Sequence, residues 1–270
     1  MVLNLTVLAF LGIFGLLLIL SLVRNPFFGL YAYLFVFYNH PGFRWWGEGL
    51  PEIRWSLMAA VVTVVSLAIH LPPRSTVPWH ANLGARILML FTVWGWIQMG
   101  WAVSMEAHLE QCILFTKYCL LFYLIYRLSS DVKAIENFAW AHVAGCFIIG
   151  WIMYTSASPG RVEVTVGAGM MDANLVGMQL ATGLIFGGVL FLGNTGIRRW
   201  LALAPLPFIL NGIILGGSRG ATVAMVASGI VMLYLIPSQY FRSFLLAGIL
   251  GCVLFSVLSH DLFWDRISTL

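Results

Sequence analysis

Charged residues are scarce in this chain of 270 residues. They make up 9% of the sequence, against roughly 25% in a soluble domain, while hydrophobic residues make up 61%. This balance excludes a soluble domain with a buried core and indicates an integral membrane protein. The net charge of +4 is too small and too scattered to indicate nucleic-acid binding.

Cysteine is rare as well. Cys112, Cys119, Cys146 and Cys252 all fall inside apolar runs, with no paired spacing typical of metal ligands. We therefore expect packing or lipid-facing thiols, and no metal or other cofactor.

The N-terminus lacks the features of a cleaved signal peptide. The stretch "MVLNLTVLAFLGIFGLLLILSLV" has no basic n-region and no small-residue cleavage site. Its apolar run is longer than a typical signal core, so we expect a retained first span.

Long apolar runs set the fold class. Runs of about 16 to 22 residues suit helices across a roughly 30 Å hydrocarbon layer, whereas barrel strands would be shorter and would alternate in polarity. The sequence predicts an all-α, polytopic transmembrane protein that forms a single transmembrane domain over 1–270. About ten spans are expected: 2–22, 26–38, 55–71, 87–105, 112–128, 138–157, 173–192, 200–216, 220–236 and 243–259.

The loop charges predict an orientation, because cytoplasmic loops carry an excess of Lys and Arg. One set of loops has only Asp131 and Glu136 as acids, and its basic residues are Arg24, Arg74, Arg86, Arg127, Lys133, Arg198, Arg199 and Arg242. The other set is richer in acids and holds Arg161, Asp172 and Arg219. We predict that the first set is cytoplasmic and the second faces outward.

Small residues, prolines and aromatics predict local contacts. Gly183 and Gly187 form a spacing that lets helix backbones approach closely in lipid, and Pro205 and Pro207 predict a kink in their span. Tryptophans in the outer connection 39–55 suit an interfacial belt: Trp45, Trp46 and Trp55.

Arg219 lies in the turn "LGGSRGATV", between two apolar runs. A guanidinium stays charged there and needs water, a headgroup or an anionic partner. The turn also begins a helix, so backbone N–H groups and the helix dipole add to the positive field and favour a phosphate or diphosphate. The alternative is that Arg219 anchors the chain on lipid phosphate.

A second cluster lies in "GRVEVTVGAGMMDANLVG", residues 160–177. Arg161 precedes a short segment with extended alternation, and Asp172 and Asn174 start a helix as cap candidates. One interpretation is a plain helix cap. The other is a loop over the outer mouth, where Arg161 and Arg219 hold one polyanion from two sides.

These motifs carry a resemblance to a family. "GAGMMDANLVGMQLATGLIF", followed by an Arg-Arg turn, one more span and "LGGSRGATVAMVASGIVMLYL", resembles the O-antigen ligase and polymerase superfamily. "RNPFFGLYAYLFVFYNHPGFRWWG" is similar to the N-terminal part of the O-glycosylation ligases associated with bacterial exosortase systems. The chain thus resembles the N-terminal part of an O-antigen ligase-like fold.

The resemblance implies a glycosyltransferase at the periplasmic face of the bacterial inner membrane. The donor would be a glycan on a polyprenyl diphosphate and the acceptor a glycolipid or protein, with surrounding membrane lipid and without nucleic acid, nucleotide sugar or metal. It implies that Arg219 and Arg161 are the catalytic cations, which neutralise the departing diphosphate. Donor-binding residues would be Ser218, Gly220, Asp172 and Asn174.

The chain departs from the family at its end, "SHDLFWDRISTL", where family members continue through a large outer loop with a catalytic histidine. Either the chain is a fragment or a truncated homologue, or the second half is supplied elsewhere, and we expect that these 270 residues alone do not complete the transfer. Asp172 and Glu163 are weak substitutes as base. His142, inside a span, is expected to be a packed helix-interface residue rather than a proton relay.

The alternative function is a transporter or flippase of a lipid-linked or anionic solute. The short second span and the Gly- and Pro-broken helices favour it, because transporters build binding sites from such helices. Against it, the candidate charges cluster at one face, and no acid in mid-span offers a coupling site.

Overall fold

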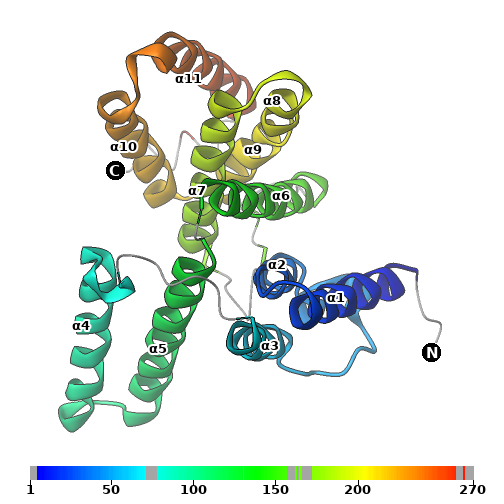
Figure 1. Cartoon of the computed structure of the whole chain (residues 1–270). Coiled ribbons are helices and arrows are strands. Elements are labelled where there is room, and N and C mark those ends of the chain that lie inside the picture. Colours follow the sequence, from blue (N-terminus) through cyan, green and yellow to red (C-terminus); the bar gives the residue numbers. More distant parts are fainter. Residues whose placement is uncertain are drawn as a thin grey trace.

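The computed structural model describes residues 5–70, 78–129, 131–156, 162, 164–165, 172–259 and 264, and it is all-helical over these residues (Figure 1). Short 3-10 turns are η1 (Pro41–Phe43), η2 (Trp45–Gly47), η3 (Trp79–Ala81) and η4 (Met99–Trp101). The α-helices are α1 (Leu5–Val23), α2 (Phe27–Tyr38), α3 (Trp55–Ile69), α4 (Leu83–Gln98), α5 (Met105–Leu128), α6 (Val132–Thr155), α7 (Ala173–Gly193), α8 (Gly196–Leu203), α9 (Leu206–Gly216), α10 (Arg219–Leu235) and α11 (Ser238–Leu258).

Six segments are long and apolar enough to cross a membrane: α1, α5, α6, α7, the combined α8–α9 segment and α11. The other predicted spans correspond to α2, α3, α4 and α10, with 12, 15, 16 and 17 residues. At about 1.5 Å per residue, these four helices fall short of the roughly 30 Å hydrocarbon layer. The described residues confirm a helical multi-pass membrane protein, but they support six spans and not the predicted ten.

The centre of the molecule is built from α6, α7 and α9, with α2 packed on α6. Glycines allow this close packing, because added Cβ atoms would collide with neighbouring helices. A Cβ on Gly183 would lie 2.7 Å from Cys146 Sγ, and one on Gly187 would overlap Leu206. The predicted close approach at Gly183 and Gly187 is confirmed.

The helix break at Pro205 also agrees with the sequence. α8 ends at Leu203, and α9 begins at Leu206 with Pro205 at its N-cap position. Proline has no N–H to continue the hydrogen-bond ladder of the preceding helix, so the predicted kink is a change of helix.

A second cluster joins α1, α2 and α3. Trp55, the first residue of α3, is buried edge-on against Phe10 and Phe14, with ring centroids 5.5 and 5.6 Å apart. The interfacial belt predicted for Trp55 is therefore wrong, because aromatic packing between helices takes up its indole ring. Trp45 is 76% exposed, as an interfacial residue would be.

The two ends of the central bundle are distinct. α6 and α9 end where α7 and α10 begin: Met153 in α6 lies beside Gly216 at the end of α9. The start of α6 is at the other end, about 36 Å away along its 24 residues. The α4–α5 hairpin projects away from this bundle, as Figure 1 shows.

Candidate functional site

Both sequence motifs begin a helix with a side-chain cap. Asp172 Oδ1 accepts hydrogen bonds from the backbone N–H groups of Asn174 (2.6 Å) and Leu175 (3.3 Å) at the start of α7. Ser218 Oγ accepts one from Ala221 N–H (3.0 Å) at the start of α10. The sequence thus located the Asp172 cap correctly, and Ser218 plays the same role in the second motif.

The two caps are joined to each other. The Ser218 hydroxyl donates to Asn174 Oδ1 at 2.8 Å, across 44 positions of sequence. α7 and α10 approach closely here, because a Cβ on Gly177 would lie 2.5 Å from Ala221 Cβ. The pairing of the Asp-Ala-Asn and Ser-Arg-Gly motifs is thus a direct contact between two helix N-termini.

Arg219 and Gly220 form the exposed side of this junction. Gly217, with φ of 55°, ends α9 in the left-handed region and allows the chain to turn at once into α10. A Cβ on Gly220 would lie 3.6 Å from Asn174 Oδ1, so the first turn of α10 faces Asn174. The first N–H groups of both helices and the Arg219 guanidinium give this surface a positive field, partly offset by Asp172.

Arg161 and Glu163 lie outside the described residues. Their described neighbours are nevertheless informative. Val162 N–H donates to Leu215 O at 3.1 Å, and Val162 and Val164 are buried in the central cluster. Residues 162 and 164 are therefore fixed against the end of α9, next to the turn that leads to Arg219.

Arg44 is a residue that the sequence reasoning missed. Its guanidinium donates to Tyr38 O at 2.8 Å and to Thr165 O at 3.3 Å, so it ties the outer connection 39–54 to residue 165. Burial lowers the pKa of Arg44 from its ordinary value. The signal available in the sequence was an arginine flanked by aromatic residues within "PGFRWW".

His142 lies in a buried polar network between α2, α6 and α7. Gln179 Nε2 donates to Tyr38 Oη (2.7 Å), which lies 2.9 Å from His142 Nδ1, and His142 Nε2 lies 2.9 Å from Thr182 Oγ1. Thr182 in turn donates to Gln179 O at 2.7 Å. The prediction of a packed interface histidine is confirmed, because each ring nitrogen has a neutral partner in a neighbouring helix.

One arrangement of hydrogens gives each donor of this network an acceptor. If Tyr38 donates to Nδ1, then His142 carries its hydrogen on Nε2 and donates to Thr182, and the circuit closes on Gln179. A neutral imidazole satisfies every partner. A charged imidazole would carry a hydrogen on Nδ1 as well, so the Tyr38 hydroxyl would face two donors, this N–H and the Gln179 amide.

The described residues contain no group of three or more His, Cys, Asp or Glu side chains that could hold a metal ion. Cys112 and Cys146 are buried, Cys119 is half-buried and Cys252 is exposed, and all four are on helices. This confirms the prediction of packing or lipid-facing thiols.

Comparison of the chain with family models, with curated proteins and with solved structures gives no match. The family expected from the motifs therefore stays a prediction.

Proposed function

We propose that this protein is an O-antigen ligase-like glycosyltransferase of the bacterial inner membrane. It moves a glycan from a polyprenyl diphosphate to a lipid or protein acceptor at the periplasmic face. A new bond forms between the acceptor oxygen and the anomeric carbon, and the bond from that carbon to the diphosphate oxygen breaks. The acceptor hydroxyl loses its proton, and polyprenyl diphosphate leaves.

One observation carries the proposal: the Ser218–Asn174 hydrogen bond, which joins the two motifs that resemble the family. Sequence separation alone gives no reason for these short motifs to meet. Their contact creates a single surface with two helix N-termini, suited to an anion with several oxygens.

The proposed roles follow from the geometry of each side chain. Arg219 is exposed at the first turn of α10, where its fork of N–H donors can hold two diphosphate oxygens as negative charge develops. Gly220 leaves room for the diphosphate to approach the backbone. Arg161 is the second proposed cation.

Ser218 and Asp172 act as positioning residues in this proposal. The Ser218 hydroxyl is 2% exposed and already bonded to Asn174 and Ala221, so it holds α10 against α7. Asp172 Oδ1 caps α7 and orients the backbone that presents Asn174. Neither Asp172 nor Glu163 is proposed as the base.

The proposed topology puts the Arg219 surface outside and Arg198 inside, because the candidate spans α7 and α8–α9 lie between these two surfaces. Single cysteines at Gly169 and Thr195, in a background without the native cysteines, test it with a membrane-impermeant thiol reagent. Labelling of Gly169 from outside and of Thr195 only after permeabilisation is expected. Labelling of both from one side overturns this topology.

The function is tested in proteoliposomes with a polyprenyl diphosphate-linked oligosaccharide and an acceptor glycolipid. Glycan on the acceptor together with free polyprenyl diphosphate is the expected result for the protein expressed from its full reading frame. The α8–α9 break favours a transporter as second candidate, because such broken helices build transport sites. Movement of intact donor across the bilayer without release of diphosphate identifies that function instead.

A further inference from the structure

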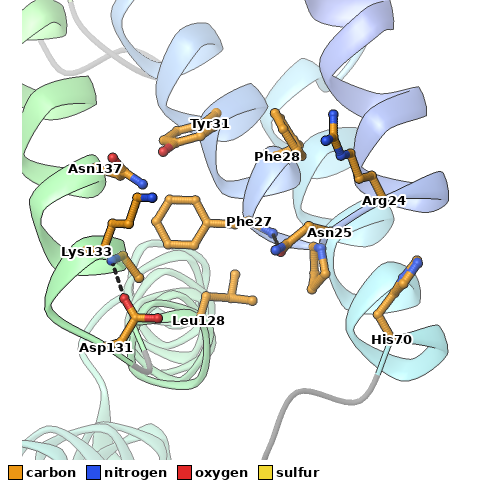
Figure 2. Close-up of a pocket in the computed structure, with 12 residues that line it drawn as sticks. Arg24, Asn25, Phe27, Phe28, Tyr31, His70, Leu128, Asp131, Lys133 and Asn137 are labelled. Carbon is orange, nitrogen blue, oxygen red and sulfur yellow. Dashed lines mark hydrogen bonds between the residues drawn. The ribbon is translucent and has the colours of Figure 1, made fainter.

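A recess lies at the other end of the bundle, where α6 begins (Figure 2). Its volume is about 500 Å³, and it opens between the end of α1, the start of α2, the end of α3 and the α5–α6 turn. The proposed transfer site is at the opposite end of α6, so this recess belongs to a different surface.

The side chains of the recess divide into a polar and an apolar part. Phe27 and Leu128 are buried, and Phe27 packs edge-on against Tyr31 with centroids 4.9 Å apart. Figure 2 shows the Lys133 and Asn137 side chains reaching from α6 toward Tyr31, with Arg24 on the far side of Phe28. Lys133 and Asn137 are four residues apart and share one helix face.

The charge of the recess is set by its side chains. The starts of α2 and α6 and the ends of α1, α3 and α5 all border it, so the helix dipoles oppose one another. Arg24 and Lys133 are exposed, and the described part of the chain offers no hydrogen-bond or ion-pair partner to either side chain. Asp131, the acid that lines the recess, already accepts from Ala134 N–H at 2.7 Å as the cap of α6. His70 Nδ1 lies 3.2 Å from Ser66 O.

The recess also lies at a defined depth. Three candidate spans terminate there, since α1 and α5 end at it and α6 begins at it. The ends of spanning helices lie near the headgroups of the bilayer, where cationic pockets between helices recognise anionic lipids. An apolar floor beside two cations suits an amphiphile with a phosphate better than a free phosphate ion.

We propose that this recess binds the phosphate group of an anionic membrane phospholipid. Lys133 and Asn137 hold the phosphate oxygens, Arg24 adds to the positive field, and Phe27, Phe28 and Leu128 contact the glycerol and the first acyl methylenes. This proposal does not depend on the proposed glycan transfer.

The test is native mass spectrometry of the protein released from nanodiscs that contain equal amounts of phosphatidylglycerol and phosphatidylcholine. The wild-type protein is expected to retain phosphatidylglycerol selectively. Lys133→Ala is expected to reduce this selective retention about fivefold, with a similar loss for Arg24→Ala, and Lys133→Arg is expected to keep it. Arg242→Ala, an exposed cation at the start of α11, is the matched control.

Three results overturn the proposal. The first is equal retention of both lipids, and the second is an equal loss in the Arg242→Ala control. The third is displacement of the bound lipid by millimolar inorganic phosphate, which identifies a free-phosphate site instead. Each variant is also unfolded thermally. A midpoint equal to that of the wild-type protein establishes that a loss of lipid retention reflects the recess and not a change of fold.

Discussion

The glycines of α6 and those of α11 lie in very different surroundings, although both helices are apolar and long enough to span a membrane. A Cβ on Gly150 would overlap the carbonyl of Phe208, whereas one on Gly251 would meet nothing within 4 Å. In the most apolar 18-residue stretch of α6, 44% of the residues are buried, and in that of α11 none are. Both helices are apolar enough for lipid, and both contain glycine, so neither property alone decides which one is packed inside the protein. The glycines of α6 face neighbouring helices, whereas those of α11 face open space.

The largest effect is expected from Gly150→Ala. The new methyl group meets a backbone carbonyl, which cannot move aside as a flexible side chain would, so we expect a loss of stability of about 1–3 kcal/mol. Gly251→Ala is the matched control in α11 and is expected to change stability little. Thermal unfolding in the same detergent compares the two variants. Equal shifts of the unfolding midpoint would contradict the contrast between the two helices.

Tyr38→Phe is expected to have an effect of similar size. It removes one hydroxyl and leaves both the Gln179 amide and His142 Nδ1 without that partner, at a cost of about 1–3 kcal/mol. Tyr234→Phe, at a tyrosine 90% exposed in α10, is the control and is expected to be neutral. A Tyr38→Phe protein as stable as its control would show that the network adds nothing to the fold.

Much of the helical framework follows from the sequence, because apolar runs, Pro205 and the Asp172 cap are local signals. The buried network does not, since Tyr38 and Gln179 are 141 positions apart and nothing local pairs them. For the same reason the contacts of Arg44 were missed and the surroundings of Trp55 were predicted wrongly. Their environment is set by neighbouring helices, and the sequence pattern around a residue does not show which helix packs against it.

Part of the candidate site could likewise be predicted from the sequence, and part could not. The positions of Asp172, Ser218 and Arg219 at helix starts could be predicted from capping chemistry. The Ser218–Asn174 bond required the packing of α7 on α10, which depends on Gly177. Arg161 lies outside the described residues, so its partnership with Arg219 stays a prediction.

A smaller effect is expected from Ser218→Ala. It removes the cap of α10 and the partner of Asn174, at a cost of about 0.5–2 kcal/mol. Ser256→Ala is the matched control, because the hydroxyl of this exposed serine in α11 donates to the Cys252 carbonyl of its own helix, four residues before it. Combining each change with Asn174→Ala measures the coupling: Ser218 should couple to Asn174 and Ser256 should not.

The smallest effect concerns pH at the outer connection. Burial, and to a lesser extent the Arg44 guanidinium, lowers the pKa of His40 from its ordinary value of 6.5. The neutral ring accepts from Gly42 N–H at 3.3 Å. Because the unfolded state takes up a proton more readily, the stability from neutral His40 is present above pH 6.5 and is lost as the pH falls through the lowered pKa.

Hydrogen exchange at the Gly42 amide measures this pH effect. After correction for the intrinsic rate, exchange should become faster as the pH falls below 6.5. His40→Asn keeps an acceptor that does not titrate, and it should abolish the pH dependence. An unchanged profile in that variant would contradict the assignment to His40.

The most direct measurement of the central claim is equilibrium binding of polyprenyl diphosphate to the protein in nanodiscs, with polyprenyl alcohol as the uncharged reference. The account predicts a clear preference for the diphosphate. It also predicts that Arg219→Lys weakens diphosphate binding about tenfold or more, because the charge remains but the fork geometry is lost. Arg198→Lys, at an exposed arginine in α8, should have no such effect. Equal affinity for diphosphate and alcohol, or an Arg219→Lys protein that binds as wild type does, would contradict the claim that the junction of α7 and α10 receives the donor.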